Sequence, residues 1–322
     1  MKKSTVSALL AALVLTVSAN TGLAAEAADN SLSVTGEATL HWERGKVKGE
    51  DTAHTGEQTF ILNFNQPLSD KFSLYTRFAY RHFSGDDNAD SIHELDQYGL
   101  IYQTETDTLK LGSQDLEFGT AAALVDLTEV GRKDMFRGAN WLSETEHRTL
   151  NVIIGKADGQ FEKSEDGDRF ADGDDKTVFG LTLGKTFGDV TVSGEYLHVR
   201  DAADAEVPGS VYGLGLATSA DKWDFSLAGL KSSANSKNTG VIADVTYNMS
   251  DTDTLSAIYR NFQDNAVVGG LATYDPGTKG VELVWAKSLS DRWGLELSHE
   301  RVSYKDGSPK ERVTYIETTY SF

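Results

Sequence analysis

The stretch that decides the fold reads Arg312-Val-Thr-Tyr-Ile-Glu-Thr-Thr-Tyr-Ser-Phe322. Counting back from Phe322 in twos gives an apolar-leaning set that includes Tyr320 and Ile316, whereas the positions between them lean polar. Because side chains alternate between the two faces of a strand, the stretch is predicted to be a strand with unlike faces. Aromatic rings at a strand end favour a barrel in a membrane, where they can lie at the headgroup boundary. The alternative is a terminal strand of a soluble sandwich.

The same alternation recurs along the chain, between stretches of turn-forming residues. Fifteen segments are predicted to be strands, near 32–43, 58–66, 71–83, 95–104, 107–113, 148–157, 176–187, 189–199, 210–219, 222–231, 239–249, 252–262, 279–288, 292–304 and 311–322. Proline cannot donate a hydrogen bond to a strand ladder, so it is expected between strands. All four prolines lie there, at Pro67, Pro208, Pro276 and Pro309. The chain is therefore predicted to be all-β.

The connections alternate between short and long, which is typical of an up-and-down barrel with tight periplasmic turns and large outer loops. The predicted long, polar connections are 45–57, 84–92, 157–175, 200–209, 263–278 and 304–310. An odd strand count would leave the two ends on opposite sides, so a sixteenth strand is predicted at 134–142, followed by a tight turn at 143–146. The predicted fold is a 16-stranded antiparallel transmembrane β-barrel.

Residues 1–25 are predicted to be a cleaved signal peptide, because Lys2 and Lys3 precede an apolar run at 8–17 and small residues near Ala25. An uncleaved anchor is the alternative. Residues 26–322 would form the barrel domain, and loss of the two lysines would change the formal charge from −19 to −21. Such a negative charge argues against binding to nucleic acid. There is no cysteine, so disulfides cannot contribute to stability.

The connection after the fifth strand, residues 114–133, differs from the other long ones because it carries much apolar surface. Its apolar residues are Leu116, Phe118, Leu124, Val125, Leu127 and Val130, and residues 120–127 include a run of good helix formers. A barrel of sixteen strands encloses a channel too wide for wall side chains to fill. We expect this loop to fold inward, with its apolar side on the wall and its acids facing the lumen.

The sixteen strands, the inward-folded loop and the terminal Phe322 resemble, in that order, the general diffusion porins of Gram-negative outer membranes. The ending also resembles the assembly signal of bacterial outer-membrane proteins. The resemblance implies a pore constriction in which loop acids oppose wall arginines: Asp115, Glu117, Asp126 and Glu129 against Arg77, Arg81 and, from the sixteenth strand, Arg137. The second strand offers only Ile61, Asn63 and Asn65 inward, so the basic cluster would be thinner than in the family. A homotrimer is implied too, in contact with outer-membrane lipid and lipopolysaccharide.

The expected function is passive diffusion of small hydrophilic solutes and ions, because opposed charges across a constriction favour small polar solutes over apolar ones. The prevailing acids predict a mild preference for cations. A substrate-specific channel and a surface adhesin remain alternatives. No cofactor and no enzymatic activity are expected, since no nucleophile elbow or phosphate loop occurs. The acids of 164–175 and those at Asp86, Asp87 and Asp90 are interpreted as hydrated loops, because their spacing does not fit a calcium loop.

Overall fold

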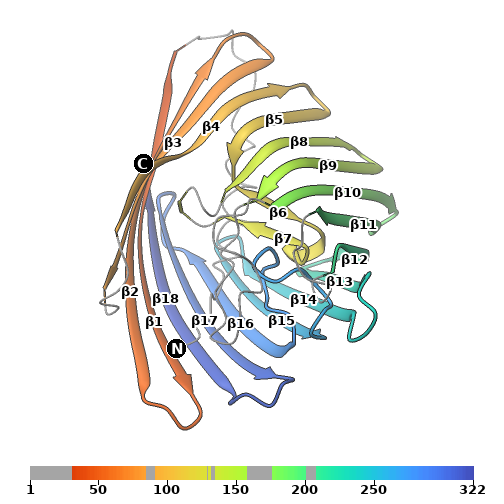
Figure 1. The fold of residues 1–322 in the computed structure, drawn as a ribbon. Coiled ribbons are helices and arrows are strands. Elements are labelled where there is room, and N and C mark those ends of the chain that lie inside the picture. Colours follow the sequence, from red (N-terminus) through yellow and green to blue (C-terminus); the bar gives the residue numbers. More distant parts are fainter. Residues whose placement is uncertain (1–30, 85–90, 129, 132–134, 158–175, 201–207) are drawn as a thin grey trace.

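The computed structural model describes residues 31–84, 91–128, 130–131, 135–157, 176–200 and 208–322. Sixteen antiparallel strands form one closed barrel, in the order β1-β18-β17-β16-β15-β14-β13-β12-β11-β10-β9-β8-β5-β4-β3-β2 (Figure 1). Two further short strands, β6 and β7, pair with each other inside the ring. No helix in the described part of the chain is long and apolar enough to span a membrane. The predicted fold class is confirmed.

The barrel strands have the following bounds: β1 Ser33–Val47, β2 Thr52–Pro67, β3 Phe72–Ser84, β4 Ile92–Gln103, β5 Asp107–Gln114, β8 Phe136–Thr145, β9 Arg148–Ala157, β10 Lys176–Phe187, β11 Val190–Arg200, β12 Ser210–Ala220, β13 Trp223–Ser232, β14 Thr239–Ser250, β15 Asp253–Phe262, β16 Thr278–Ser288, β17 Trp293–Tyr304 and β18 Glu311–Ser321. The predicted sixteenth strand at 134–142 corresponds to β8, which extends to Thr145 and so includes most of the turn expected at 143–146.

Closure of the barrel depends on the last strand, as the alternation of its sequence predicts. β18 pairs with β1 along eleven register positions, from Glu37 opposite Ser321 to Val47 opposite Glu311. Beyond the strand, the N–H of Phe322 donates to the carbonyl of Gly36 at 3.0 Å, and the N–H of Gly36 donates back at 2.9 Å. No edge is left between the first and last strands, which is what a membrane-spanning sheet requires.

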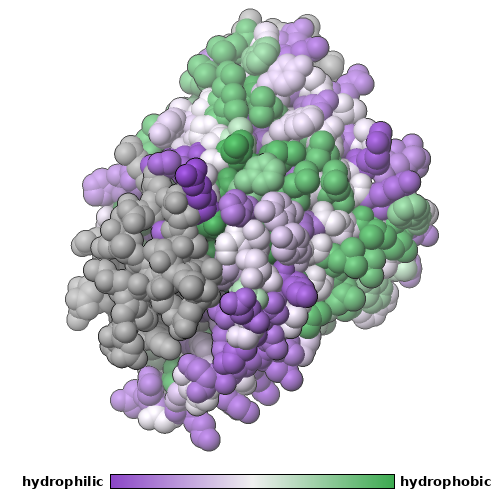
Figure 2. Space-filling model, turned by 45° about the vertical axis from the view of Figure 1, so that its right-hand side comes forward, coloured by the Kyte–Doolittle hydropathy of each residue, from purple (hydrophilic) through white to green (hydrophobic). Residues whose placement is uncertain are grey.

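The outer face carries large apolar side chains, several of them more than 40% exposed: Leu40, Trp42, Leu214, Trp223, Leu283, Trp293 and Ile316. Figure 2 shows hydrophobic side chains gathered in broad areas on the face in view. Aromatic rings contact each other near the ends of neighbouring strands. The ring centroids are 4.6 Å apart for Trp223 and Tyr247, and 4.8 Å apart for Trp293 and Tyr320. This arrangement matches the aromatic girdle of a transmembrane barrel.

The inner face carries charged side chains. Arg77, Glu195, Arg260, Glu282, Glu296 and Glu300 are all buried. Cross-strand partners share a face, so the register pairs Glu282 with Glu300 and Glu296 with Glu317 on this inner wall. Two carboxylates stand directly opposite each other in each pair, and the wall of β16, β17 and β18 is therefore strongly acidic.

The predicted long loop at 45–57 is wrong. β1 extends to Val47 and β2 begins at Thr52, so only a four-residue turn separates them. The polar residues of this region continue the ladder, and the ring of Trp42 stacks on that of His54 at 5.6 Å. Alternation of polar and apolar residues predicts a strand only where one face is apolar, and here both faces carry polar side chains. The signal segment 1–25, the acidic stretch 164–175 and the acids at 86–90 lie outside the described residues.

Candidate functional site in the barrel lumen

The connection after β5 folds into a small hairpin, which we call the inner hairpin and define as residues 116–127. It consists of β6 (Leu116–Phe118), a 3-10 turn (Thr120–Ala122) and β7 (Val125–Leu127). The good helix formers of 120–127 form only this 3-10 turn: φ is 88° at Gly119, 54° at Ala121 and 48° at Ala122, so the chain reverses there. Helix propensity in this short run is outweighed by the pairing of β6 with β7 and by burial of both strands.

One face of the inner hairpin is apolar and packs against the barrel wall. Leu116, Phe118, Val125 and Leu127 are each at most 3% exposed. They belong to one hydrophobic cluster with inward side chains of the wall, among them Ile153 on β9, Val178 on β10 and Leu197 on β11. Full burial of each Leu, Val or Phe side chain is worth about 1.5–3 kcal/mol. The hairpin is therefore held inside the barrel by a core of its own.

Glycines of the wall make room for the inner hairpin. A Cβ on Gly180 would lie 2.7 Å from the ring of Phe118, and one on Gly215 would lie 2.2 Å from Oγ1 of Thr120. Both distances are shorter than any real Cβ contact. β10 and β12 therefore have glycine, with no side chain, at the positions where the hairpin packs.

Glu195 on β11 tethers the turn of the inner hairpin. Its Oε1 accepts a hydrogen bond from the N–H of Thr120 at 2.9 Å and another from the hydroxyl of Thr120. Glu195 is only 5% exposed, so these charge-assisted bonds form away from bulk water. The sequence alone does not reveal this contact, because Thr120 and Glu195 lie 75 positions apart along the chain.

Two of the predicted site acids lie on the other face of the inner hairpin. Glu117 and Asp126 are directly opposite in the β6–β7 register, and both are less buried than their apolar neighbours. Burial and the nearby charges of Asp126 and Asp115 raise the pKa of Glu117 to about 7. The hydroxyl of Thr128 donates to Asp126 at 2.8 Å. The hairpin thus separates an apolar face on the wall from an acidic face.

Asp115 precedes the inner hairpin and pairs with a wall lysine. Its Oδ1 lies 3.1 Å from Nζ of Lys110 on β5. Burial alone would raise the pKa of Asp115, but the charges of Lys110 and Arg77 outweigh it and lower the pKa. Asp115 therefore stays ionised but is neutralised by its partner. Glu129, the fourth predicted acid, lies outside the described residues.

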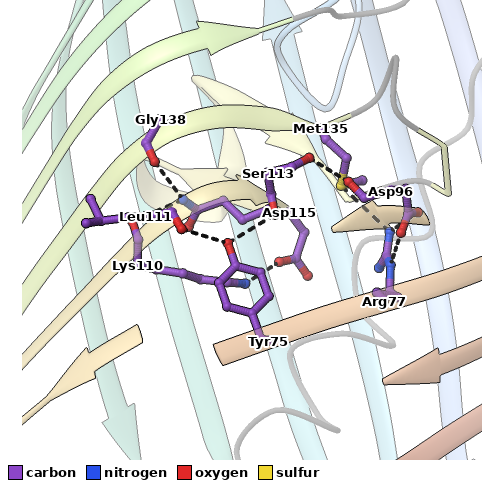
Figure 3. Close-up of polar contacts among 10 residues, drawn as sticks. Tyr75, Arg77, Asp96, Lys110, Leu111, Ser113, Asp115, Met135 and Gly138 are labelled. Atoms are coloured by element: carbon purple, nitrogen blue, oxygen red, sulfur yellow. Dashed lines mark hydrogen bonds and ion pairs between the residues drawn. The ribbon is translucent and has the colours of Figure 1, made fainter. Parts of the chain in front are cut away.

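Arg77, a predicted wall base, lies in the lumen but is bound by an acid of the wall itself (Figure 3). Its Nε and Nη2 donate to the two carboxylate oxygens of Asp96 at 2.9 and 2.7 Å. Asp96 is fully buried, and it also accepts the N–H of Gly131 at 3.1 Å. The carboxylate thereby joins β3, β4 and the segment that follows the inner hairpin.

Asp96 was missed by the sequence analysis because a β-bulge changes the alternation of β4. Arg77 lies opposite Gln97 and Phe78 lies opposite Leu95, so Asp96 is the extra residue. The bulge leaves Asp96 and Gln97 both buried, while Leu95 and Tyr98 on either side are exposed outward. Period-two counting assumes an unbroken strand and cannot place two adjacent side chains on one face.

The other two predicted bases lie elsewhere. Nη2 of Arg81 on β3 contacts Oε2 of Glu57 on β2 at 2.9 Å, so this guanidinium too has an acid partner on the wall. Arg137 on β8 stands an even number of residues from Trp141, whose ring faces outward. Residues an even number apart on a strand share a face, so Arg137 lies on the outward side of β8. Its neighbour Phe136 is buried on the inward side.

A polar depression lies on the lumen wall beside these residues, with a volume of about 310 Å³. It spans β1 to β5 and is lined by Ser33, Thr35, Asn63, Phe64, Asn65, Tyr75, Thr76, Arg77, Gln97, Ile101 and Lys110. Nζ of Lys110 lies 4.8 Å from the ring centroid of Tyr75, whose hydroxyl donates to the carbonyl of Ser113 at 3.0 Å (Figure 3). Amides and hydroxyls predominate here, and the two bases have acid partners.

Comparisons with solved structures show that the barrel shares its fold with bacterial porins. A mutant of Rh. blastica porin matches with a TM-score of 0.59 and 13% identity, over 91% of this chain and 100% of that one. Pseudomonas aeruginosa OpdQ matches with a TM-score of 0.62 and 13% identity, over 91% and 99%. No family model and no curated protein sequence matches the chain. At this identity the likeness is one of fold.

Proposed function

We propose that the protein is a porin of a bacterial outer membrane, which forms a water-filled channel for passive diffusion of small hydrophilic solutes and ions. The observation that carries this proposal is the inner hairpin, which lies inside the barrel with its apolar face on the wall and Glu117 and Asp126 on the opposite face. In a barrel of sixteen strands the hairpin narrows a lumen that wall side chains leave open. The similarity of fold to known porins supports the proposal.

Cation preference forms part of the proposal. Described bases of the lumen such as Arg77, Arg81 and Lys110 each have an acid partner, whereas the acidic wall pairs of β16 to β18 bring carboxylates together. The excess of acids raises the local concentration of cations. We infer that ions are selected by the net negative charge of the lumen. This differs from the constriction implied by the resemblance, in which an arginine cluster opposes the loop acids.

A bilayer experiment tests both parts. The purified protein, reconstituted in a planar bilayer, should show single-channel conductance that rises with salt concentration. In a potassium chloride gradient its reversal potential should have the sign of cation preference. A reversal potential of the opposite sign contradicts the cation preference, and a protein that inserts but does not conduct contradicts the proposal of a channel.

A substrate-specific channel is the second candidate, favoured by the polar depression along β1 to β5. Its volume of about 310 Å³ is at the lower end for a small-ligand site. A specific channel would show saturable flux and block of the current by its solute. Liposome swelling with sugars of graded size distinguishes the two candidates, because a general porin shows a size cutoff alone.

The proposed location is the outer membrane, where the outward apolar and aromatic side chains would contact lipid and lipopolysaccharide. We also propose that the barrel associates as a homotrimer. Light scattering of the protein in detergent, corrected for bound detergent, measures the mass of the assembly. A mass equal to that of one chain would refute the trimer and leave the channel proposal intact.

A further inference from the structure

The connection between β15 and β16, residues 263–277, does not extend into solvent as a polar outer loop would. Ala266, Val267, Val268 and Leu271 are each at most 1% exposed, and Tyr274 is 7% exposed. All five belong to the same hydrophobic cluster as the inner hairpin. The sequence predicts a polar loop at 263–278, because its apolar residues are few and interspersed with Gly, Asp and Asn. We call residues 263–277 the second inner segment.

Two hydrogen bonds join the second inner segment directly to the inner hairpin. The N–H of Asp126 donates to the carbonyl of Leu271 at 2.6 Å. Oγ1 of Thr273 donates to the carbonyl of Ala122 at 3.0 Å, in a buried contact between residues 151 positions apart. The first bond fixes β7, and the second fixes the turn of the hairpin. The two elements therefore hold each other in place.

Tyr274 anchors the second inner segment to the barrel wall. Its hydroxyl donates to Oε2 of Glu282 on β16 at 3.0 Å, and Cζ of Arg260 on β15 lies 4.0 Å from its ring centroid. Arg260 also forms an ion pair with Glu300 on β17. The ring thus contacts side chains of β15 and β16 on the inner side of the barrel, and Arg260 links it indirectly to β17.

The wall behind these two elements carries mainly apolar inward side chains, although Glu195 on β11 and Arg260 on β15 are buried there too. Its inward side chains include Leu197, Val211, Ala228, Leu230, Ile242, Ile258 and Phe262, all buried in the shared cluster. They extend over β11, β12, β13, β14 and β15. The inward residues of β1 and β2 across the barrel are mostly polar, and Asn63 and Asn65 there are exposed to the lumen. The lumen thus has a mainly apolar side at β11 to β15 and a mainly polar side at β1 and β2.

We infer that the second inner segment is a second pore-narrowing element, which together with the inner hairpin excludes water from the β11–β15 side of the lumen. Solutes then pass along the polar wall of β1 to β5, and Leu271 and Thr273 determine the size cutoff through the position of the hairpin. This inference rests on the proposed channel function. The two elements act together because they share one hydrophobic cluster and two hydrogen bonds.

Thiol labelling tests where water reaches. The protein has no cysteine, so a single introduced thiol is the only one present. Ile242→Cys places it on the apolar wall and Asn63→Cys on the polar wall. In the reconstituted barrel, a charged, water-soluble methanethiosulfonate should modify Asn63→Cys at least about tenfold faster, because a thiol in apolar surroundings is inert. Equal rates would overturn the inference.

Thr273→Val and Leu271→Ala test the link between the two elements. Thr273→Val keeps the shape of the side chain and removes the hydroxyl that donates to Ala122. In either background the thiol of Ile242→Cys should become more reactive, and the single-channel conductance and sugar cutoff should increase. Thr252→Val, in an exposed turn, is the matched control and should change neither.

The outcomes separate the inference from the function on which it rests. Far-ultraviolet circular dichroism of each variant establishes that the barrel has formed. A conducting wild type whose conductance and labelling are unaffected by Thr273→Val and Leu271→Ala would overturn the second element alone. A folded wild type that does not conduct would refute the channel, while the labelling rates would still decide whether the β11–β15 side is dry.

Discussion

Glu117 is a residue of the inner hairpin whose charge is sensitive to pH near neutrality. Its pKa of about 7 has its causes in burial and in the carboxylates of Asp126 and Asp115. The side chain is therefore ionised above pH 7 and neutral below it. If the channel prefers cations as proposed, we expect that preference to increase between pH 5.5 and 8.5, and we expect Glu117→Gln to reduce the increase.

The size of this effect follows from Coulomb's law. A full charge about 5 Å from a permeating ion in water contributes about 0.8 kcal/mol, which corresponds to a two- to fourfold change in permeability ratio once salt screening is included. Reversal potentials in a fixed salt gradient measure it. If wild type and Glu117→Gln show the same pH dependence, other carboxylates of the lumen are responsible and Glu117 is not.

Asp96 is expected to matter more for stability than for ion selection. Asp96→Asn removes the charge that binds Arg77 through two hydrogen bonds in a buried position. Breaking a buried pair on one side costs about 3–5 kcal/mol. Glu57→Gln is the matched control, because its pair with Arg81 is partly exposed and is worth about 1 kcal/mol or less.

Urea unfolding in lipid vesicles measures both changes. A loss of unfolding free energy in Asp96→Asn no larger than that in Glu57→Gln would contradict the structural role of Asp96. It would mean that Arg77 finds an equally good partner in its surroundings.

The inner hairpin is the element on which the proposed function depends, and the wall glycine Gly180 tests how it docks. A Cβ there would lie 2.6 Å from Ile153 and 2.7 Å from Phe118, so Gly180→Val forces the hairpin away from β10. Overpacking of this kind costs about 1–3 kcal/mol. We expect a larger and noisier single-channel conductance.

Gly184→Val is the matched control for this variant. Gly184 lies on the same strand and the same face, where a Cβ would approach no atom closer than 3.4 Å. Gly184→Val should conduct as wild type does. Equal conductance in wild type and Gly180→Val would show that the hairpin does not depend on contact with β10.

Strand existence could be predicted from the sequence, whereas local departures from regular pairing could not. Alternation and the parity of connections were enough to find β8, although its sequence is the least strand-like. Alternation fails where polar residues occupy both faces, as in the turn-proximal parts of β1 and β2. It fails again at Asp96, since a bulge is a matter of pairing between strands and leaves no signal in one strand alone.

The inner elements show a second limit of the sequence. The apolar residues of 114–133 predicted an inward loop, but the run of alanines favoured a helical turn that the structure replaces with a hairpin. The second inner segment carries only a few apolar residues, and its burial depends on Leu271 and Tyr274 meeting a hairpin about 150 positions earlier. Contacts at that separation are decided by the closed barrel, not by local propensity.

At the scale of the whole molecule, the fold requires the aromatic rings to face lipid and the charges to face water. The five tryptophans report on this directly. Trp42, Trp141, Trp223 and Trp293 are between 40 and 47% exposed on the outer face, and Trp285 alternates with the buried inward Glu282 and Val284. All five are expected outside the barrel, because strand alternation gives them the parity of the outward apolar residues.

Fluorescence quenching by lipid tests this orientation. In vesicles of lipids brominated on the acyl chain, the tryptophan emission should fall by more than half relative to unbrominated lipid, since every ring is within reach of the bilayer. Bromines placed near the headgroup should quench Trp223 and Trp293 most, because these rings lie at strand beginnings with Tyr247 and Tyr320. Single-tryptophan variants resolve the depths. Emission that aqueous iodide quenches and brominated lipid does not would mean that the rings line water, and the inside and outside of the barrel would then be reversed.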